Sequence, residues 1–306
     1  MSFNRFLFLS MTIMLSSFFL LKAEENLLEK KPSNKIIYLI TPPRSLSVAF
    51  TRMMQERGDH EVFHEPSQYA YDMCYYPDIA EAWYKKDSYA TFNDVKTALY
   101  IGAAKKPVFA KEISFAVEEF LEKNLDFIKD ENVQFAFLMR NPHHAVISFY
   151  KKLNYIPSEF DFLIGYESLN HIFQLVLEYS KNKPVIIFTE DLYNNPEGTV
   201  EAFCSAVGIP FLPHSLHWSN LGSEFDGKDE WHELKYKEFV HHWHGDAIQS
   251  TGFAKPLQYE LDSQGKPTFA EIKNPKDREE CLKIYLHNLH FSELLKKETD
   301  YILVPQ

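Results

Sequence analysis

The stretch IIYLITPPRSLSVAFTR (residues 36–52) predicts a buried strand, a turn and the start of a helix. Its first five residues are apolar, whereas Pro42 and Pro43 prevent a helix before Ser45, and a serine is expected to cap that helix. A strand end followed by a helix N-terminus presents free backbone N–H groups and the positive end of a helix dipole. With Arg44 beside these groups, the stretch predicts an anion-binding site. The pattern GxxxxGK(S/T) is absent, which argues against an ATPase or a conventional kinase.

The same alternation of strand and helix continues along the chain. Apolar runs at 108–111, 133–139 and 185–189 are followed by amphipathic stretches at 115–125, 142–153 and 196–207. Strands that are apolar on both faces predict an α/β fold, a three-layer α/β/α domain with a central parallel sheet, whose ligands bind at the carboxyl ends of the strands. A last amphipathic helix is expected over 278–303, with Leu282, Tyr285, Leu286 and Leu289 on its apolar face.

The N-terminal segment resembles a targeting signal in its composition. One positive charge precedes an uncharged apolar run at 6–21, so residues 1–23 are expected to be a signal peptide cleaved near Ala23. Residues 24–34 then form a polar linker, and residues 35–306 form the folded domain. The protein is thus expected in the secretory pathway, secreted or periplasmic. An uncleaved single-pass anchor remains the alternative, since about 17 apolar residues just suffice to span a bilayer.

Charge and cysteine content exclude two further classes of protein. The 306 residues carry 32 Lys+Arg against 43 Asp+Glu, a formal net charge of −11, and no basic tract, so a nucleic-acid partner is not expected. The three cysteines, Cys74, Cys204 and Cys281, are too few for a disulfide scaffold. One intramolecular disulfide stays open as an alternative.

Residues 41–49 resemble the 5′-phosphosulfate loop of the sulfotransferases, which carries a Pro-Lys/Arg-Ser-Gly-Ser/Thr-Thr pattern at the same strand-to-helix junction. Two positions depart from the pattern: Leu46 stands where Gly is usual, and Val48 where Thr is common. Because the donors are mostly main-chain N–H groups, Leu46 fits if its φ angle stays negative. The resemblance implies that the 5′-phosphate of the donor is bound by Arg44, Ser45, Leu46, Ser47 and Val48.

Two more stretches are similar to motifs of this family. Arg140 follows the strand at 133–139 and precedes Ser148 by eight residues, as in the family's 3′-phosphate motif. Pro142 can start the intervening helix, which brings Ser148 back toward Arg140, and both then converge on one phosphate. The alternative is a salt bridge from Arg140 to an acid in a loop. Residues 188–210 are similar to the family's Glu-Asp-Leu, Asn-Pro and Leu-Gly-Ile sequence and support the fold.

The resemblance implies the P-loop-NTPase-like sulfotransferase fold and 3′-phosphoadenosine 5′-phosphosulfate (PAPS) as co-substrate, with no metal. A sulfuryl group would pass in line to an acceptor hydroxyl on a small molecule, a glycan or a tyrosine peptide, with Arg44 stabilising the charge that builds on the leaving phosphate. The poorly matched residues 211–306 are expected to select the acceptor. The alternative is a non-catalytic nucleotide-binding or effector protein that keeps the fold.

Glu65 is the preferred catalytic base. It ends a short strand expected beside the first one and lies 21 residues after Arg44, a placement that resembles the catalytic Glu of tyrosylprotein-type sulfotransferases. His64 is its competitor. Lys111 lies in a stretch similar to the Lys-x-His element of cytosolic members but without the His, so it is expected to support the leaving phosphate. The alternatives are that Glu65 caps the next helix through Ser67 and that Lys111 is an exposed lysine.

A histidine-rich segment remains after these assignments. His232 and the run at 241–244 precede Asp246, but no zinc-binding spacing is present. The segment is therefore expected to be an aromatic loop that contacts substrate or solvent, and no metal site is predicted.

Overall fold

The computed structural model describes residues 33–84, 89–225 and 236–305. The predicted signal peptide, nearly all of the linker and His232 lie outside these residues. Among the residues that the structure describes, no helix combines the length and apolar character needed to cross a bilayer.

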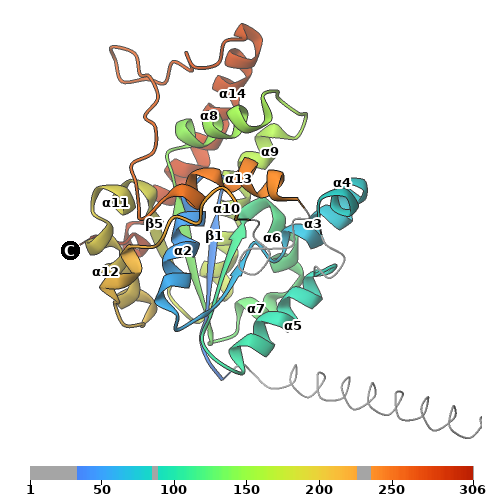
Figure 1. The fold of residues 1–306 in the computed structure, drawn as a ribbon, viewed down its shortest axis with the longest axis vertical. Helices are drawn as coiled ribbons and strands as arrows, with labels where there is room; N and C mark the ends of the chain where they lie inside the picture. The colour runs from blue at the N-terminus through green and yellow to red at the C-terminus, as the bar shows by residue number, and fades with distance from the viewer. Residues whose placement is uncertain (1–32, 85–88, 226–235, 306) are drawn as a thin grey trace, which may run out of the picture.

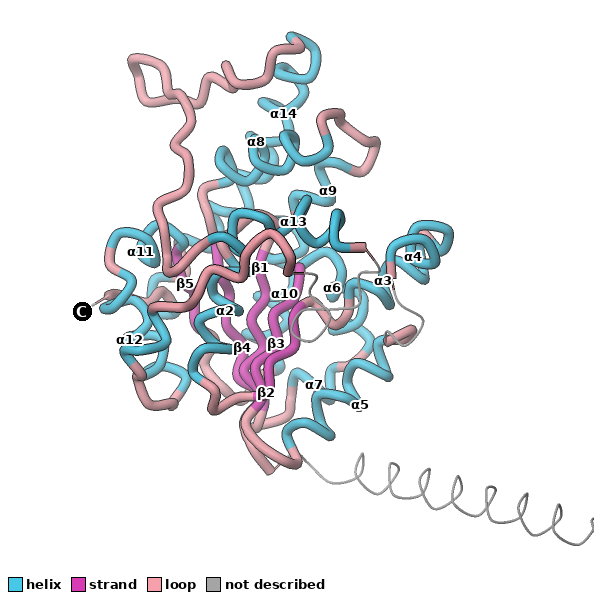
Figure 2. Tube along the Cα trace, in the orientation of Figure 1, coloured by secondary structure: helices cyan, strands magenta, loops and turns pink. Residues whose placement is uncertain are grey.

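A five-stranded, all-parallel sheet forms the centre of the fold (Figures 1 and 2). Its strands are β1 Ile36–Thr41, β2 Glu61–His64, β3 Val108–Ile113, β4 Val133–Met139 and β5 Val185–Phe188, in the order β2-β3-β1-β4-β5. The predicted parallel sheet is confirmed. The expectation that the short second strand lies beside the first is wrong, because β3 pairs with β1 on one side and with β2 on the other.

Helices cover both faces of the sheet, as the continuous apolar strands predict. Ile36, Tyr38 and Ile40 of β1 pack in one core cluster with residues of α5 Phe92–Ala103, α6 Ser114–Lys123, α7 Leu125–Ile128 and α10 Tyr166–Tyr179. Ile37 and Leu39 point to the other face, where they pack with α2 Ser47–Arg57 and α12 Pro196–Val207. Alternate residues of one strand thus bury opposite faces, which gives the predicted three-layer α/β/α architecture.

The remaining helices surround the carboxyl end of the sheet or complete its sides. They are α3 Gln68–Tyr75, α4 Pro77–Trp83, α8 Pro142–Leu153, α9 Phe160–Ile164, α11 Thr189–Asn194, α13 Lys237–Gln249 and α14 Pro275–Lys296, with short 3₁₀ turns at Pro213–Leu216 and Thr299–Tyr301. In Figure 1, α13 lies close to the upper ends of the strands. This position makes α13 a cover for the edge of the sheet at which ligands bind.

The last helix differs from its prediction. It begins at Pro275 and ends at Lys296, and Leu282 and Leu286 of the expected apolar face are exposed. The helix packs against α8, α9 and α10 through a rotated face, whose buried residues are Cys281, Ile284, Tyr285, Asn288, Ser292 and Leu295. Cys281 is one of the three cysteines, all of which are free, so the alternative of an intramolecular disulfide is not found.

Candidate functional site

A cavity of about 630 Å³ opens at the carboxyl ends of the strands. The loop after β1, the end of β3 and the residue after β4 contribute Arg44, Lys111 and Arg140 to its lining, and Glu65 follows β2. Helix α13 closes the cavity with Trp243 and His244. Four neighbouring strands, β2, β3, β1 and β4, thus each place a charged side chain in this cavity, from the strand itself or from the residues that follow it.

The loop after β1 has an unusual backbone. Arg44 and Leu46 both have a φ angle of +63°, whereas Ser45 between them is not among the residues with positive φ. Alternating conformations of this kind turn successive N–H groups toward one concavity, which suits an anion. The expectation of a negative φ at Leu46 is wrong. The left-handed conformation costs a non-glycine residue about 1–2 kcal/mol, and packing of Leu46 against the core under α2 offsets part of that cost.

Helix α2 begins without a capping side chain. It starts at Ser47, two residues later than expected, with Leu46 at the N-cap position, no side-chain cap and no acid in the first turn. The predicted serine cap is wrong, because the Ser45 hydroxyl donates 2.8 Å to the carbonyl of Pro42. The Ser45 carbonyl accepts a 2.9 Å hydrogen bond from Thr189 Oγ1, which fixes the loop. The first N–H groups of α2 are thereby left for a bound anion.

The Arg44 side chain is held from three sides. Its Nε donates 3.1 Å to Ser148 Oγ on α8, and its Nη1 donates 2.8 Å to the carbonyl of Trp243 on α13. Asp246 lies 3.8 Å from Nη2. Burial lowers the pKa of the guanidinium, the Asp246 charge opposes that change, and the nearby Arg140 charge adds to it. The site therefore carries concentrated positive charge that an anion would stabilise.

Arg140 is buried directly after β4. Its Nη1 donates 2.6 Å to the carbonyl of Arg44, and the Tyr166 hydroxyl donates to the carbonyl of Arg140. Among the described residues no carboxylate lies within ion-pair distance of Arg140, so the alternative of a loop salt bridge is wrong. Ser148 is brought to the same network, through Arg44 rather than through Arg140.

Glu65 and Lys111 form a buried ion pair in which Lys111 Nζ donates to Glu65 Oε1. Lys111 is 1% exposed, and burial lowers its pKa while the Glu65 charge opposes that change. Both alternatives for these residues are wrong: Lys111 is not exposed, and the Glu65 side chain does not cap α3, whose N-cap residue is Ser67 and lacks a side-chain cap. Glu65 itself has a φ angle of +52°, which turns the chain sharply at the end of β2.

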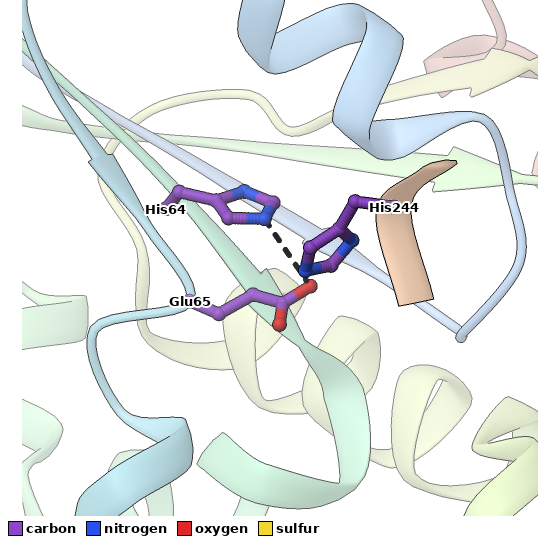
Figure 3. Close-up of side chains that lie close together, drawn as sticks. All are labelled: His64, Glu65 and His244. Carbon is purple, nitrogen blue, oxygen red and sulfur yellow. Dashed lines mark ion pairs between the residues drawn. The ribbon is translucent and has the colours of Figure 1, made fainter. Parts of the chain in front are cut away.

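Two histidines adjoin this ion pair (Figure 3). His64 Nε2 lies 3.9 Å from Glu65 Oε1, and the rings of His64 and His244 meet edge to face with centroids 5.2 Å apart. Burial lowers the pKa of His244 to about 4, so its imidazole is neutral at physiological pH. His244 belongs to helix α13, so the prediction of an aromatic loop is wrong. The histidines in 241–244 stood out in the sequence, but no sequence pattern predicted that His244 lies beside Glu65.

His64, Glu65 and His244 also offer ligand atoms within 4.8 Å of one another, a set that fits a metal ion by residue type. Lys111, however, donates to the same carboxylate, and both Lys111 and Arg44 lower the pKa of His244 through their charge. An additional cation at this point would meet two positive charges. The prediction of no metal remains a prediction.

Glu112 supports the site from behind. Its carboxyl group accepts hydrogen bonds from Ser67 Oγ at 2.6 Å and from the Tyr38 hydroxyl at 3.1 Å. Complete burial raises the pKa of Glu112 to about 8, so the group is largely protonated at neutral pH. A neutral Glu112 thus ties the segment after Glu65 to the centre of the sheet.

Aromatic side chains line the rest of the cavity. They are Tyr71, Tyr76, Trp83, Tyr84, Phe115, Phe149, Tyr155, Trp243 and Tyr259. Only the last two come from residues 211–306, where acceptor selectivity was expected. The sequence analysis did not predict that α3 and α4 line the cavity. The aromatic run at 69–76 was the available indication.

Comparisons with known proteins identify a family for this chain. A family model described as a sulfotransferase domain matches residues 35–263. The chain is 28% identical over 278 residues to the branched-chain-amino-acid aminotransferase-like protein 2 of Arabidopsis thaliana, covering 85% of this chain and 43% of that protein. The chain thus spans less than half the length of that relative.

Solved structures similar to the chain include the sulfotransferase domain from the curacin biosynthetic pathway, at 15% identity and a TM-score of 0.47, covering 76% of this chain and 95% of that one. A mouse sulfotransferase complexed with PAP is 10% identical with a TM-score of 0.42, covering 90% and 92%.

Proposed function

Because this chain belongs to the sulfotransferase family, we propose that it moves a sulfuryl group from PAPS to an acceptor hydroxyl by in-line displacement. The observation that carries the proposal is the network of Arg44, Arg140 and Ser148 around a loop with alternating backbone conformation. The buried guanidinium of Arg140, the partly exposed one of Arg44 and the uncapped N-terminus of α2 suit a ligand with two phosphate groups.

The proposed binding mode divides these groups between the two ends of the nucleotide. The amides of residues 45–48 and Arg44 hold the 5′-phosphate, while Arg140 and Ser148 hold the 3′-phosphate. Ser148 Oγ accepts from Arg44 Nε, which leaves its own O–H to donate to a phosphate oxygen. These contacts are the proposed binding mode of the nucleotide. The loop and its neighbours already present the protein groups that the contacts require.

Glu65 is proposed as the base and Lys111 as the support for the leaving group. The acceptor O–H gives its proton to Glu65 as the new O–S bond forms, and the bond between sulfur and the phosphate oxygen breaks. Adenosine 3′,5′-bisphosphate (PAP) leaves with the bonding electron pair, and Arg44, the loop amides and Lys111 stabilise its charge. His64 remains the competitor of Glu65, because its Nε2 lies 3.9 Å from Glu65 Oε1.

A transfer assay tests the proposal. The protein is incubated with PAPS labelled in the sulfuryl group and with panels of phenols, sugars and tyrosine peptides, and label in the acceptor is measured. Labelled product that depends on Glu65 supports the proposal. Saturable PAP binding with no label in any acceptor favours the non-catalytic nucleotide-binding alternative, in which the fold is kept and turnover is lost.

We also propose that residues 1–23 direct the domain to the secretory pathway, with a single-pass anchor as the alternative. PAPS is made in the cytosol, so an enzyme beyond the membrane needs imported donor. Fractionation of the native protein and sequencing of its N-terminus test this proposal. A mature chain that begins near Glu24 in a secreted fraction supports it, and an intact N-terminus in a cytosolic fraction contradicts it.

A further inference from the structure

One acid in the cavity has no counter-charge among the described residues. Asp72 lies on α3, lines the cavity and is 8% exposed. Its Oδ2 accepts 2.8 Å from the Tyr84 hydroxyl and its Oδ1 accepts 3.3 Å from Gln68 Nε2. Within the described chain no Lys, Arg or His forms an ion pair with it. By contrast, Glu65, the proposed base, pairs with Lys111, whereas Asp72 has no cationic partner among the described residues.

The Asp72 carboxylate can accept further hydrogen bonds. Each carboxylate oxygen offers about two acceptor positions, and each oxygen of Asp72 has one neutral donor. Burial raises the pKa of Asp72 to about 6, and the hydrogen bonds from Tyr84 and Gln68 oppose that change. A cation placed beside it would supply the missing charge.

Aromatic residues adjoin this acid along the chain and line the same cavity. Tyr71 precedes Asp72 on α3, Tyr76 lies between α3 and α4, and Trp83 and Tyr84 lie at the end of α4 and directly after it. The Tyr84 hydroxyl is the one that donates to Asp72. The faces of such rings attract an ammonium group, Trp most strongly. Acidic and aromatic groups together form a site that suits an organic cation better than a neutral or anionic group.

The charge of the cavity is divided along its length. Arg44, Arg140 and Lys111 lie at the nucleotide end, whereas the lining residues between 68 and 84 include no Lys or Arg. The two ends are close, because the N–H of Gln68, whose side chain donates to Asp72, donates 3.0 Å to the backbone carbonyl of Glu65. An acceptor with an ammonium group would be repelled from the nucleotide end and attracted to the other, which leaves its hydroxyl toward Glu65.

We propose that Asp72 and the rings around it bind the ammonium group of the acceptor, so that the acceptor class is a hydroxyl compound, such as a phenol, that carries a primary amine. The inference rests on the proposed sulfuryl transfer and names its substrate class. Asp72 is a specificity residue in this account and takes no part in the proton transfer.

Matched phenols test the inference. Tyramine carries an ammonium group, 4-ethylphenol is its neutral counterpart, and 4-hydroxyphenylpropionate is anionic. Loss of a charged hydrogen bond typically costs about 1.5–3 kcal/mol, so wild type should prefer tyramine to 4-ethylphenol by roughly 10-fold or more in kcat/KM. The Asp72→Asn variant should lose that preference and leave 4-ethylphenol turnover nearly unchanged. Glu159→Gln, which removes a carboxylate from the exposed rim of the same cavity, is the control and should change neither.

Direct binding of tyramine and 4-ethylphenol, measured by titration calorimetry without nucleotide, separates this inference from the proposed function. Tyramine that binds more tightly than 4-ethylphenol, with the difference lost in Asp72→Asn, supports the inference even if no sulfuryl group is transferred. Sulfuryl transfer with no preference among the three phenols supports the proposed function and overturns the inference. Absence of tyramine binding by folded wild type, or an equal effect of Asp72→Asn on both phenols, also overturns it.

Discussion

The Arg140 guanidinium donates a 2.6 Å hydrogen bond to the backbone carbonyl of Arg44. The two residues follow different strands, β4 and β1, and lie 96 positions apart in the sequence. Because Arg44 in turn donates to Ser148, the loop after β1 and the first turns of α8 form one network. PAP carries two phosphates, which is one for each guanidinium in the proposed binding mode.

Replacement of Arg140 by Ala should weaken PAP binding much more than binding of adenosine 5′-phosphate. A charge-assisted contact to the 3′-phosphate is lost only for the bisphosphate, which corresponds to roughly 10-fold or more in affinity. Titration calorimetry with both nucleotides measures the difference. Binding of adenosine 5′-phosphate is also the control for the loop, because the variant loses the hydrogen bond from Arg140 to the Arg44 carbonyl. Equal losses for the two ligands would show that Arg140 only supports the backbone of Arg44.

Glu65→Gln should remove most turnover while PAP affinity is kept. General-base catalysis typically contributes about 10²–10⁴ in rate, and the amide cannot accept the acceptor proton in the same way. The amide oxygen of the substituted side chain can still accept from Lys111 Nζ, so the variant should stay folded. Steady-state transfer rates are compared with those of His64→Asn, which should be affected much less. If Glu65→Gln stays near wild type and His64→Asn is inactive, the histidine is the base.

Two substitutions at Leu46 test the left-handed backbone of the loop. Gly adopts a φ angle of +63° without strain, whereas a β-branched side chain is a strong outlier there. Leu46→Val should therefore be less stable than Leu46→Gly by about 1–3 kcal/mol, even though Gly also loses the packing of Leu46 on the core. Urea denaturation of the two variants measures the difference. Equal stabilities would contradict the backbone geometry assigned to this loop.

The buried acid Glu112 should make stability depend on pH. Its pKa is raised from 4.5 to about 8 in the folded protein, so the folded state binds more protons than the unfolded state across that window. Stability from this group is therefore fully present below pH 4.5 and is lost as pH rises toward 8. Glu112→Gln can still accept from Ser67 and Tyr38.

The melting temperature of Glu112→Gln minus that of wild type should thus increase as pH rises from about 5 to about 8. The titrations of Asp72 and His244 occur in both proteins, so the difference between the two profiles isolates Glu112. Parallel profiles would mean that Glu112 is ionised and compensated by a group outside this account.

Local patterns in the sequence predicted the sheet well. The prediction of a strand at 133–139 and a helix at 142–153 matches β4 and α8, because the apolar run is continuous and Pro142 sets the first helical residue. The site was harder to predict where it depends on distant contacts. The alternative of Lys111 as an exposed lysine stayed open in the sequence because its partner Glu65 is 46 residues away. His244 approaches His64 only through the packing of α13, 180 positions later in the chain.

Backbone conformation was the other source of error. The loop sequence predicted where an anion would bind, and that remains a prediction. The positive φ angles of Arg44, Leu46 and Glu65, in the turns after β1 and β2, were not predicted. Side-chain identity gives little information on such angles, because Leu, Arg and Glu all disfavour them. The family pattern, with Gly usual at the position of Leu46, was the available signal.

Titration of PAP into the folded protein at moderate salt tests the central claim most directly. The account predicts saturable binding with one nucleotide per chain, weaker binding of adenosine 5′-phosphate, and loss of the difference between them in Arg140→Ala. Absence of detectable heat with folded wild-type protein across a range of temperatures would contradict both the enzymatic and the non-catalytic nucleotide-binding proposals.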